Sequence, residues 1–197
     1  MSDPINAIAD FLFEVGILKK VPRTGYAFFG TGGESVAEHV ARTACVGYAL
    51  AHMEGSVDPL QVTFMCLVHD LPEARTGDLN YVNKKYVQAD EEKAIREQTA
   101  PLPFGPEIKA AMTEFNGRET TASLLANDAD QIELLLQLKE LGDTGNPRWE
   151  EWASYCIKRL KTDEGKALAK KILERDSSDW WFSEKGDWWV NGGNETG

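Results

Sequence analysis

Two histidines and an aspartate are the residues of this chain best suited to chemistry. His39 and the adjacent pair His69-Asp70 combine imidazole and carboxylate groups, and one later aspartate would complete four ligands for a first-row divalent ion. Asp70 follows an apolar run over residues 64–68, where a buried carboxylate is costly unless a cation compensates it. Four protein ligands leave about two octahedral positions open, for an acidified water molecule and a phosphoryl oxygen, so we expect hydrolysis of a phosphate ester.

The third histidine of the chain, His52, does not extend this ligand set. It follows His39 by thirteen residues, so on one helix the two side chains point to roughly opposite faces. A di-iron oxygenase or a cyclic-dinucleotide phosphodiesterase built around such a His-Asp pair would need additional histidine ligands, which a chain with 3 histidines does not supply. We therefore expect a site for one metal ion.

The composition restricts the partners and the compartment. With 197 residues, 42% of them hydrophobic, the chain is expected to form a single compact domain. Its net charge of -11 argues against nucleic acid and anionic membranes as partners, so a small anionic substrate would need a local positive site. No apolar run approaches the roughly 20 residues of a membrane span, and the first residues lack the basic start of a signal peptide. A cytoplasmic protein is expected, with its three cysteines in the core: Cys45, Cys66 and Cys156.

Helices must position the candidate ligands. Ser35, with Glu38 three positions later, matches a capping box, so His39 would lie in the first turn of a helix that ends at Gly55. This helix start is defined by local sequence alone.

A further helix is expected to carry His69 and Asp70. It begins at Pro59, and Pro72 would bend it near its end at about residue 76. Other helical patterns cover about residues 4–18, 90–100, 106–115, 119–141, 149–160 and 163–175, and no segment alternates as a strand would. We therefore predict an all-α fold.

Two segments outside these helices have an unusual composition. Residues 21–34 form a glycine-rich loop that carries a basic residue and several aromatic ones. Residues 176–197 contain four tryptophans: Trp180, Trp181, Trp188 and Trp189. We expect these side chains to pack against the rest of the protein or against a partner subunit. We therefore divide the chain into a domain over residues 1–175 and a Trp-rich C-terminal tail over residues 176–197.

Five stretches carry a resemblance to a known family. They read Val-Pro-Arg-Thr-Gly-Tyr over 21–26, Glu-Ser-Val-Ala-Glu-His over 34–39, Leu-Val-His-Asp-Leu-Pro-Glu over 67–73, Thr-Gly-Asp over 76–78 and Asp-Ala-Asp-Gln-Ile-Glu over 128–133. In this order and spacing the chain resembles the HD-domain phosphohydrolases, and more narrowly their 5'-deoxynucleotidase group, up to about residue 160. The resemblance implies an HD-domain helical bundle, a nucleotide substrate, a homodimer and one divalent transition metal ion: Mn, Co, Fe, Ni or Zn.

The resemblance also implies four metal ligands: His39, His69, Asp70 and Asp130. Helical periodicity alone selects a different fourth ligand, because on a straight helix Asp128 shares the apolar face and Asp130 points nearly opposite. We expect Asp130, on the register of the Asp-Gln-Ile-Glu stretch, with a helix that begins or bends near residue 127.

Two acidic residues are candidates for catalysis. Glu73 follows His69 by four positions, so on a continuous helix it would share that face and could exchange protons with the activated water; the alternative is a solvated carboxylate. Asp78 matches a position that the resemblance places beside the site, where it would help to orient water or sugar. An ordinary turn role is the alternative for Asp78.

Basic and aromatic side chains are candidates for substrate binding. Arg23 presents a planar fork suited to phosphate, and the resemblance implies that it contacts the phosphate. Tyr26 stands where related proteins have a tryptophan near the nucleotide, so we expect its ring beside the substrate. Lys84 and Lys85 would assist phosphate capture or lie on solvated surface.

These residues support one leading function and two alternatives. The leading hypothesis is a 5'-deoxynucleotidase that converts deoxynucleoside 5'-monophosphates to deoxynucleosides and phosphate. The first alternative keeps the phosphohydrolase chemistry with another nucleotide or a small phosphate ester. The second is a metal-stabilised nucleotide-binding module without turnover, against which the presence of Glu73 and Asp78 argues.

Overall fold

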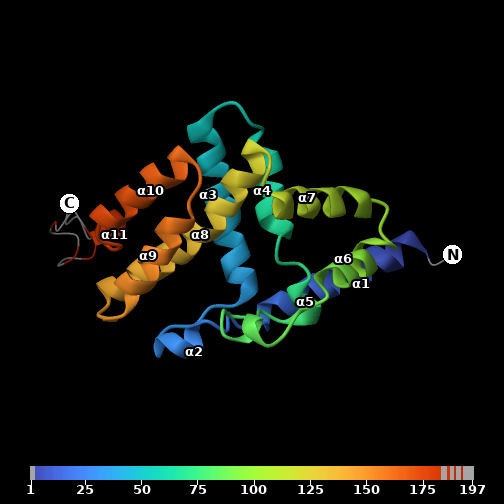
Figure 1. Cartoon of the computed structure of the whole chain (residues 1–197), viewed down its shortest axis with the longest axis horizontal. Coiled ribbons are helices and arrows are strands. Elements are labelled where there is room, and N and C mark those ends of the chain that lie inside the picture. The colour runs from blue at the N-terminus through green and yellow to red at the C-terminus, as the bar shows by residue number, and fades with distance from the viewer. Residues whose placement is uncertain (1–2, 183–185, 187–188, 190–191, 193–197) are drawn as a thin grey trace.

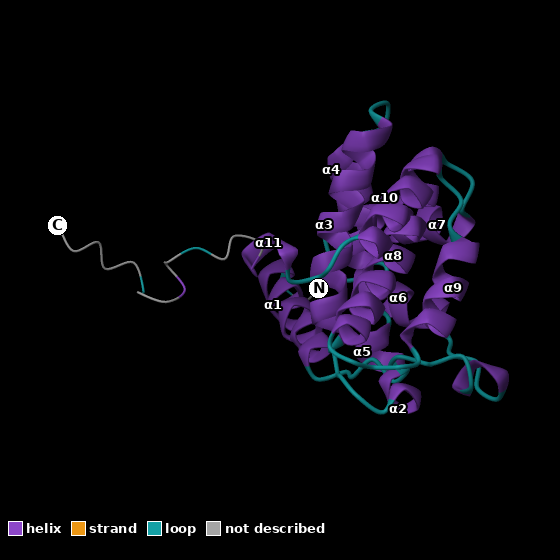
Figure 2. Cartoon of the chain, turned by 90° about the vertical axis from the view of Figure 1, so that its left-hand side faces the viewer, coloured by secondary structure: helices purple, strands orange, loops and turns teal. Residues whose placement is uncertain are grey.

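The chain folds into helices joined by loops. The computed structural model describes residues 3–182 and the single positions 186, 189 and 192. Over these residues it contains no strand (Figure 2). An isolated antiparallel bridge joins Pro22 to Ser35. The all-α prediction is confirmed. None of the described helices combines the length and apolarity needed to cross a bilayer.

The helices follow one another as the sequence patterns predict, with additions in the loops. Short 3-10 helices cover Gly16–Lys19, where the first predicted helix tightens, and Asn83–Lys85. The α-helices in Figure 1 are α1 (Pro4–Val15), α2 (Tyr26–Phe29), α3 (Val36–Glu54), α4 (Pro59–Val68), α5 (Glu73–Thr76), α6 (Glu91–Thr99), α7 (Gly105–Gly117), α8 (Thr121–Asp143), α9 (Trp149–Arg159), α10 (Asp163–Glu174) and α11 (Asp179–Phe182).

Helix α8 forms the centre of the core. It packs against α3, α4, α7, α9 and α10 (Figure 1). Its residues Leu125, Ile132 and Leu135 are fully buried. Because neighbours cover it on several sides, α8 has no single solvent-facing stripe. Several polar residues on α8, among them Asn127, Asp128 and Glu133, are therefore buried against other elements of the protein.

Helices α3 and α4 bring the two candidate histidines together. The predicted capping box is present, since Ser35 Oγ accepts from the Glu38 backbone N–H and the Ser35 backbone N–H donates to the Glu38 carboxylate. A Cβ atom at Gly47 would lie 2.5 Å from Cys66 Sγ, so the glycine allows α3 and α4 to approach closely. The first turn of α3, which carries His39, thereby faces the end of α4.

Helix α4 ends earlier than predicted. It stops at Val68, and residues 69–72 form a turn closed by hydrogen bonds from Leu71 N to Val68 O and from Glu73 N to Asp70 O. The expectation of one bent helix to residue 76 is wrong, because Pro72 offers no N–H and restricts the residue before it. His69 and Asp70 consequently lie in this turn and not inside the helix.

The predicted irregularity of α8 near residue 127 is also wrong. The helix runs without a break from Thr121 to Asp143. Within it, the Asp128 carboxylate accepts hydrogen bonds from the backbone N–H groups of Lys161 and Thr162 and from the Thr162 hydroxyl, at 2.7–2.9 Å. Asp128 thus fixes the connection between α9 and α10.

Two other expectations have mixed outcomes. Cys66 and Cys156 are buried as predicted, but Cys45 is exposed because it lies on the outward face of α3. In the C-terminal segment the rings of Trp181 and Trp189 lie 5.8 Å apart, Trp180 is exposed, and the predicted contact of Trp188 lies outside the described residues. The boundary at residue 175 stays a prediction.

The Asp128→Ala variant should lose stability. Loss of the Asp128 carboxylate leaves the backbone N–H groups of Lys161 and Thr162 without their charged acceptor, so the free energy of unfolding should fall by about 2–3 kcal/mol. Urea denaturation followed by circular dichroism measures this change. The exposed Asp163→Ala variant, at the start of α10, is the control and should lose less than about 1 kcal/mol. Equal midpoints for Asp128→Ala and the wild type would contradict this role.

Candidate metal centre and substrate cavity

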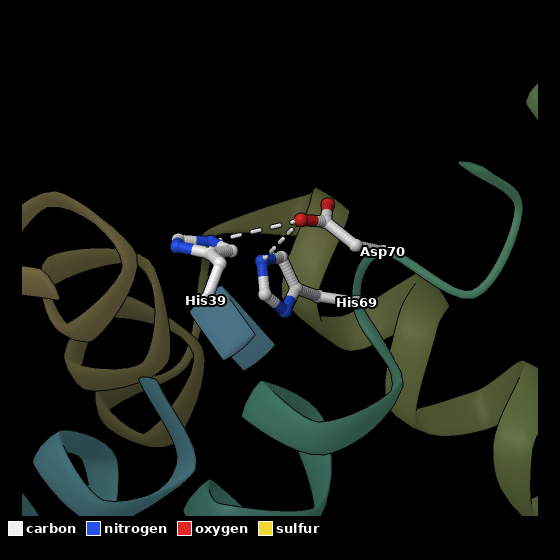
Figure 3. A group of neighbouring side chains, drawn as sticks. All are labelled: His39, His69 and Asp70. Carbon is white, nitrogen blue, oxygen red and sulfur yellow. Dashed lines mark ion pairs between the residues drawn. The ribbon is translucent and has the colours of Figure 1, made fainter. Parts of the chain in front are cut away.

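Three side chains from two elements converge at the end of α4. The Nε2 atoms of His39 and His69 lie 3.6 Å and 3.2 Å from Asp70 Oδ2, as the dashed lines in Figure 3 show. Their ligand atoms all lie within 4.8 Å of one another. The turn after α4 presents His69 and Asp70 toward the first turn of α3, so the early end of α4 places both residues of the pair at the site.

Of the two candidate fourth ligands, Asp130 lies at this cluster. Its Oδ1 atom is 3.2 Å from His39 Nε2. Asp128 instead binds the connection between α9 and α10. The role of Asp130 as a ligand is still a prediction, and its position beside His39 supports it.

The donor atoms fit a divalent cation. His39 Nδ1–H donates to Glu133 Oε2 at 2.5 Å, and His69 Nδ1–H donates to the Cys66 carbonyl oxygen at 2.7 Å. These bonds direct both Nε2 atoms toward Asp70, and within the described chain neither Nε2 atom nor Asp70 Oδ2 has a hydrogen-bond partner although all three are buried. Leaving such atoms unsatisfied costs about 1–3 kcal/mol each, which a metal ion would offset.

A second group of potential ligands shares His39 but fits a cation less well. It consists of Glu34, His39 and Glu133. Its imidazole atom, His39 Nδ1, already donates to Glu133, whereas the first group offers two unpartnered Nε2 atoms. Burial, and then the charge of Glu133, raise the pKa of Glu34 to about 7, so this carboxyl is a poor anionic ligand.

Glu133 is a residue of the site to which the sequence analysis assigned no role. Its carboxylate is fully buried, receives His39 Nδ1–H and forms an ion pair with Arg42, at 2.8 Å from Nη2 and 2.9 Å from Nε. Metal-binding histidines usually have such a carboxylate on the other ring nitrogen. The signal in the sequence is the spacing of Glu133, three positions after Asp130 and so on the same helix face.

The charges of the cluster stabilise one another. Burial opposes protonation of His39, but the nearby carboxylates of Asp130 and Glu133 outweigh it and raise the pKa of His39 to about 10. Burial also opposes the charged form of Asp70, yet the positive charge of His69 and its neighbours holds the pKa of Asp70 at about 2. The carboxylates therefore remain ionised and hold a proton on His39 in the metal-free site, and a divalent cation bound there would displace that proton.

A cavity of about 730 Å³ opens beside the cluster. Asp70 and Asp130 lie on its wall with Glu73 and Asp78, and the basic side chains Arg23, Lys84, Lys85 and Arg159 also reach it. Aromatic rings line much of the remainder: Tyr26, Phe28, Phe29, Tyr81, Trp152 and Tyr155. Charged groups beside aromatic surface suit a ligand with an anionic end and a flat ring.

Arg23 supplies the local positive charge that an acidic protein needs. Its Nη1 atom lies 3.5 Å from Asp70 Oδ2 and 3.5 Å from Asp78 Oδ1, and its side chain is 17% exposed. Asp78 also accepts from the Thr24 backbone N–H at 2.6 Å and from its hydroxyl at 2.8 Å, so it fixes the loop that carries Arg23. The Tyr26 hydroxyl lies 3.5 Å from Glu34 Oε2, with the ring in the cavity.

Glu73 lines the cavity, but it does not lie on the same helix as His69, contrary to the prediction from the sequence. It begins α5 after the turn, so the argument from one helix face shared with His69 does not hold. Its Oε2 atom is buried without a hydrogen-bond partner among the described residues. Burial, and then the carboxylates of Asp70 and Asp78, raise its pKa to about 9.

Comparison with known proteins identifies the family. Residues 15–172 match the sequence profile of the HD domain. The chain belongs to the HD domain family. A solved structure, described as a predicted metal-dependent phosphohydrolase from Magnetospirillum magnetotacticum, matches this chain with a TM-score of 0.68 at 23% identity. That match covers 87% of this chain and 91% of that one and shows a shared fold.

Relatives in sequence carry the name 5'-deoxynucleotidase HDDC2. The protein from Bos taurus is 30% identical over 145 residues, which cover 71% of this chain and 70% of that protein. The protein from Danio rerio is 31% identical over 178 residues, which cover 86% of this chain and 88% of that protein. The likeness thus spans most of this chain.

Replacing Glu133 should weaken metal binding by the HD domain. In Glu133→Gln the anionic partner of His39 Nδ1 is lost, and the affinity for Co²⁺ should fall by about 10- to 100-fold. Isothermal titration calorimetry measures the dissociation constant. Glu140→Gln is the matched control, because Glu140 pairs with the same Arg42 without touching His39. An unchanged affinity in Glu133→Gln would show that this carboxylate does not support the histidine.

Proposed function

We propose that the protein is a metal-dependent phosphohydrolase that removes the 5'-phosphate from deoxynucleoside monophosphates. The observation that carries the proposal is the cluster of buried donor atoms without partners, His39 Nε2, His69 Nε2 and Asp70 Oδ2, next to a cavity that holds Arg23. The relatives named 5'-deoxynucleotidase HDDC2 support the choice of substrate.

Four residues would hold the metal ion: His39, His69, Asp70 and Asp130. When bound there, a divalent ion supplies Lewis acidity toward a phosphoryl oxygen and lowers the pKa of a water molecule. The ion is a transition metal, and mixed imidazole and carboxylate donors accept Mn, Co, Fe, Ni or Zn.

Other side chains bind the substrate and move protons. Arg23 offers its guanidinium fork to the phosphate, and Asp78 keeps the loop of Arg23 in place. Glu73, kept protonated in the cavity by its raised pKa of about 9, gives its proton to the leaving 5'-oxygen and recovers one from the attacking water. The aromatic wall, which includes Tyr26, holds the base and excludes water.

The homodimer and the cytoplasmic location remain predictions from the sequence. Leu60, Phe64 and Leu67 form an exposed apolar face along α4, which a second copy of the chain would cover. The Trp-rich tail is the other surface that a partner subunit would contact.

The metal-loaded protein should release inorganic phosphate from dAMP, dGMP, dCMP and TMP. Glu73→Gln should lower kcat by about 10²- to 10⁴-fold, because it removes the proton-transfer group and keeps the side-chain shape. A phosphate assay with Mn²⁺ or Co²⁺ measures both, and calorimetry checks that Glu73→Gln still binds the metal. Glu97→Gln is the control, since the Glu97 carboxylate pairs with Arg75 on the surface and does not line the cavity.

Each other outcome of the assay contradicts part of the proposal. Turnover of a different phosphate ester alone would retain the phosphohydrolase and replace its substrate. Nucleotide binding without hydrolysis by the metal-loaded protein would favour the binding module. Full activity in Glu73→Gln would remove this residue from the mechanism.

A further inference from the structure

A chain of two hydrogen bonds lies on the cavity wall behind Asp130. Gln131 Nε2 donates to Asp130 Oδ2 at 2.9 Å, and Gln131 Oε1 accepts from Arg159 Nη1 at 3.1 Å. A carboxylate only accepts and a guanidinium only donates, so the two partners fix the orientation of the amide between them. Both polar atoms of the Gln131 amide group are thus hydrogen-bonded, the nitrogen to Asp130 and the oxygen to Arg159.

Arg159 is itself held in place. Its guanidinium carbon lies 4.6 Å from the centroid of the Tyr81 ring, which belongs to the loop after α5. Such stacking stabilises the cation and restricts the guanidinium plane. The hydrogen-bonded chain therefore connects α8 to α9 and to the loop that also contains Asp78.

We propose that Gln131 and Arg159 are positioning residues that set the orientation of Asp130. The Asp130 carboxylate has one oxygen, Oδ1, directed at His39 Nε2, and the other, Oδ2, bound by Gln131. Without the amide, the carboxylate is free to rotate about its terminal torsion, which has a broad energy profile. Gln131 removes this freedom before a metal ion arrives, and Arg159 keeps Gln131 in the orientation that donates to Asp130.

This inference rests on the proposed function only for the location of the metal site. The affinity for a metal ion is measured without substrate, so the test is independent of turnover. If the wild type binds Co²⁺ and hydrolyses nothing, the proposed function fails while the positioning role can still be measured.

The test is a double-mutant cycle on Co²⁺ affinity, measured by calorimetry in the absence of nucleotide. Gln131→Leu should weaken binding by about 10- to 100-fold, and Arg159→Met should weaken it less. Because Arg159 acts through Gln131, adding Arg159→Met to Gln131→Leu should cause no further loss. Gln137→Leu on α8 and Lys158→Met on α9 are matched controls that remove an amide and a cation without touching Asp130.

Several results would overturn the proposal. An unchanged affinity in Gln131→Leu would remove Gln131 from the site, and additive losses in the double variant would show that Arg159 does not act through it. If the phosphate assay gives these variants a raised KM while their Co²⁺ affinity is intact, Gln131 and Arg159 are substrate contacts instead. If Gln131→Leu fails to fold, Gln131→Asn, whose shorter amide does not span both partners, replaces it in the same cycle.

Discussion

The structure depends on a buried cluster of charged groups that is incomplete without a cation. Two imidazole nitrogens lie 3.2 Å and 3.6 Å from one aspartate oxygen, and none of these three atoms has a hydrogen-bond partner among the described residues. Burying polar atoms in this way is costly unless something binds them. The packing of α3, α4 and α8 and the early end of α4 all serve to bring these atoms together. The carboxylate of Glu133 and the carbonyl of Cys66 then fix the direction of each imidazole.

The same constraint accounts for the distribution of charge around the site. The chain carries a net charge of -11, which disfavours the approach of an anionic substrate at long range. Attraction must come from the site itself, where Arg23 lies beside Asp70 and Asp78. A bound divalent ion would add to that local positive charge. The loop of residues 21–34 matters for this reason, because it holds one guanidinium against the carboxylates.

The sequence predicted the parts of the fold that local signals define. The capping box at Ser35 located the helix of His39, and periodic apolar residues located the other long helices. Periodicity alone selected Asp128, whereas the aspartate that lies beside His39 is Asp130, because α8 is covered on several sides and its two aspartates face different neighbours. The sequence also predicted that α4 continues past Val68 with a bend at Pro72. A proline indicates that a helix is interrupted, but whether the chain bends or forms a turn depends on the contacts of the residues that follow. Glu133 received no role because its pairing with His39 and Arg42 joins residues about 90 positions apart.

The most direct test of this account is the position of the metal ion. A crystal structure of the zinc-loaded protein, with anomalous scattering collected at the zinc edge, would locate it. We expect one peak at about 2.0–2.2 Å from His39 Nε2, His69 Nε2 and an oxygen of each of Asp70 and Asp130. A peak bound by Glu34 and Glu133 instead, or bound zinc in solution with no peak among these four residues, would contradict the account.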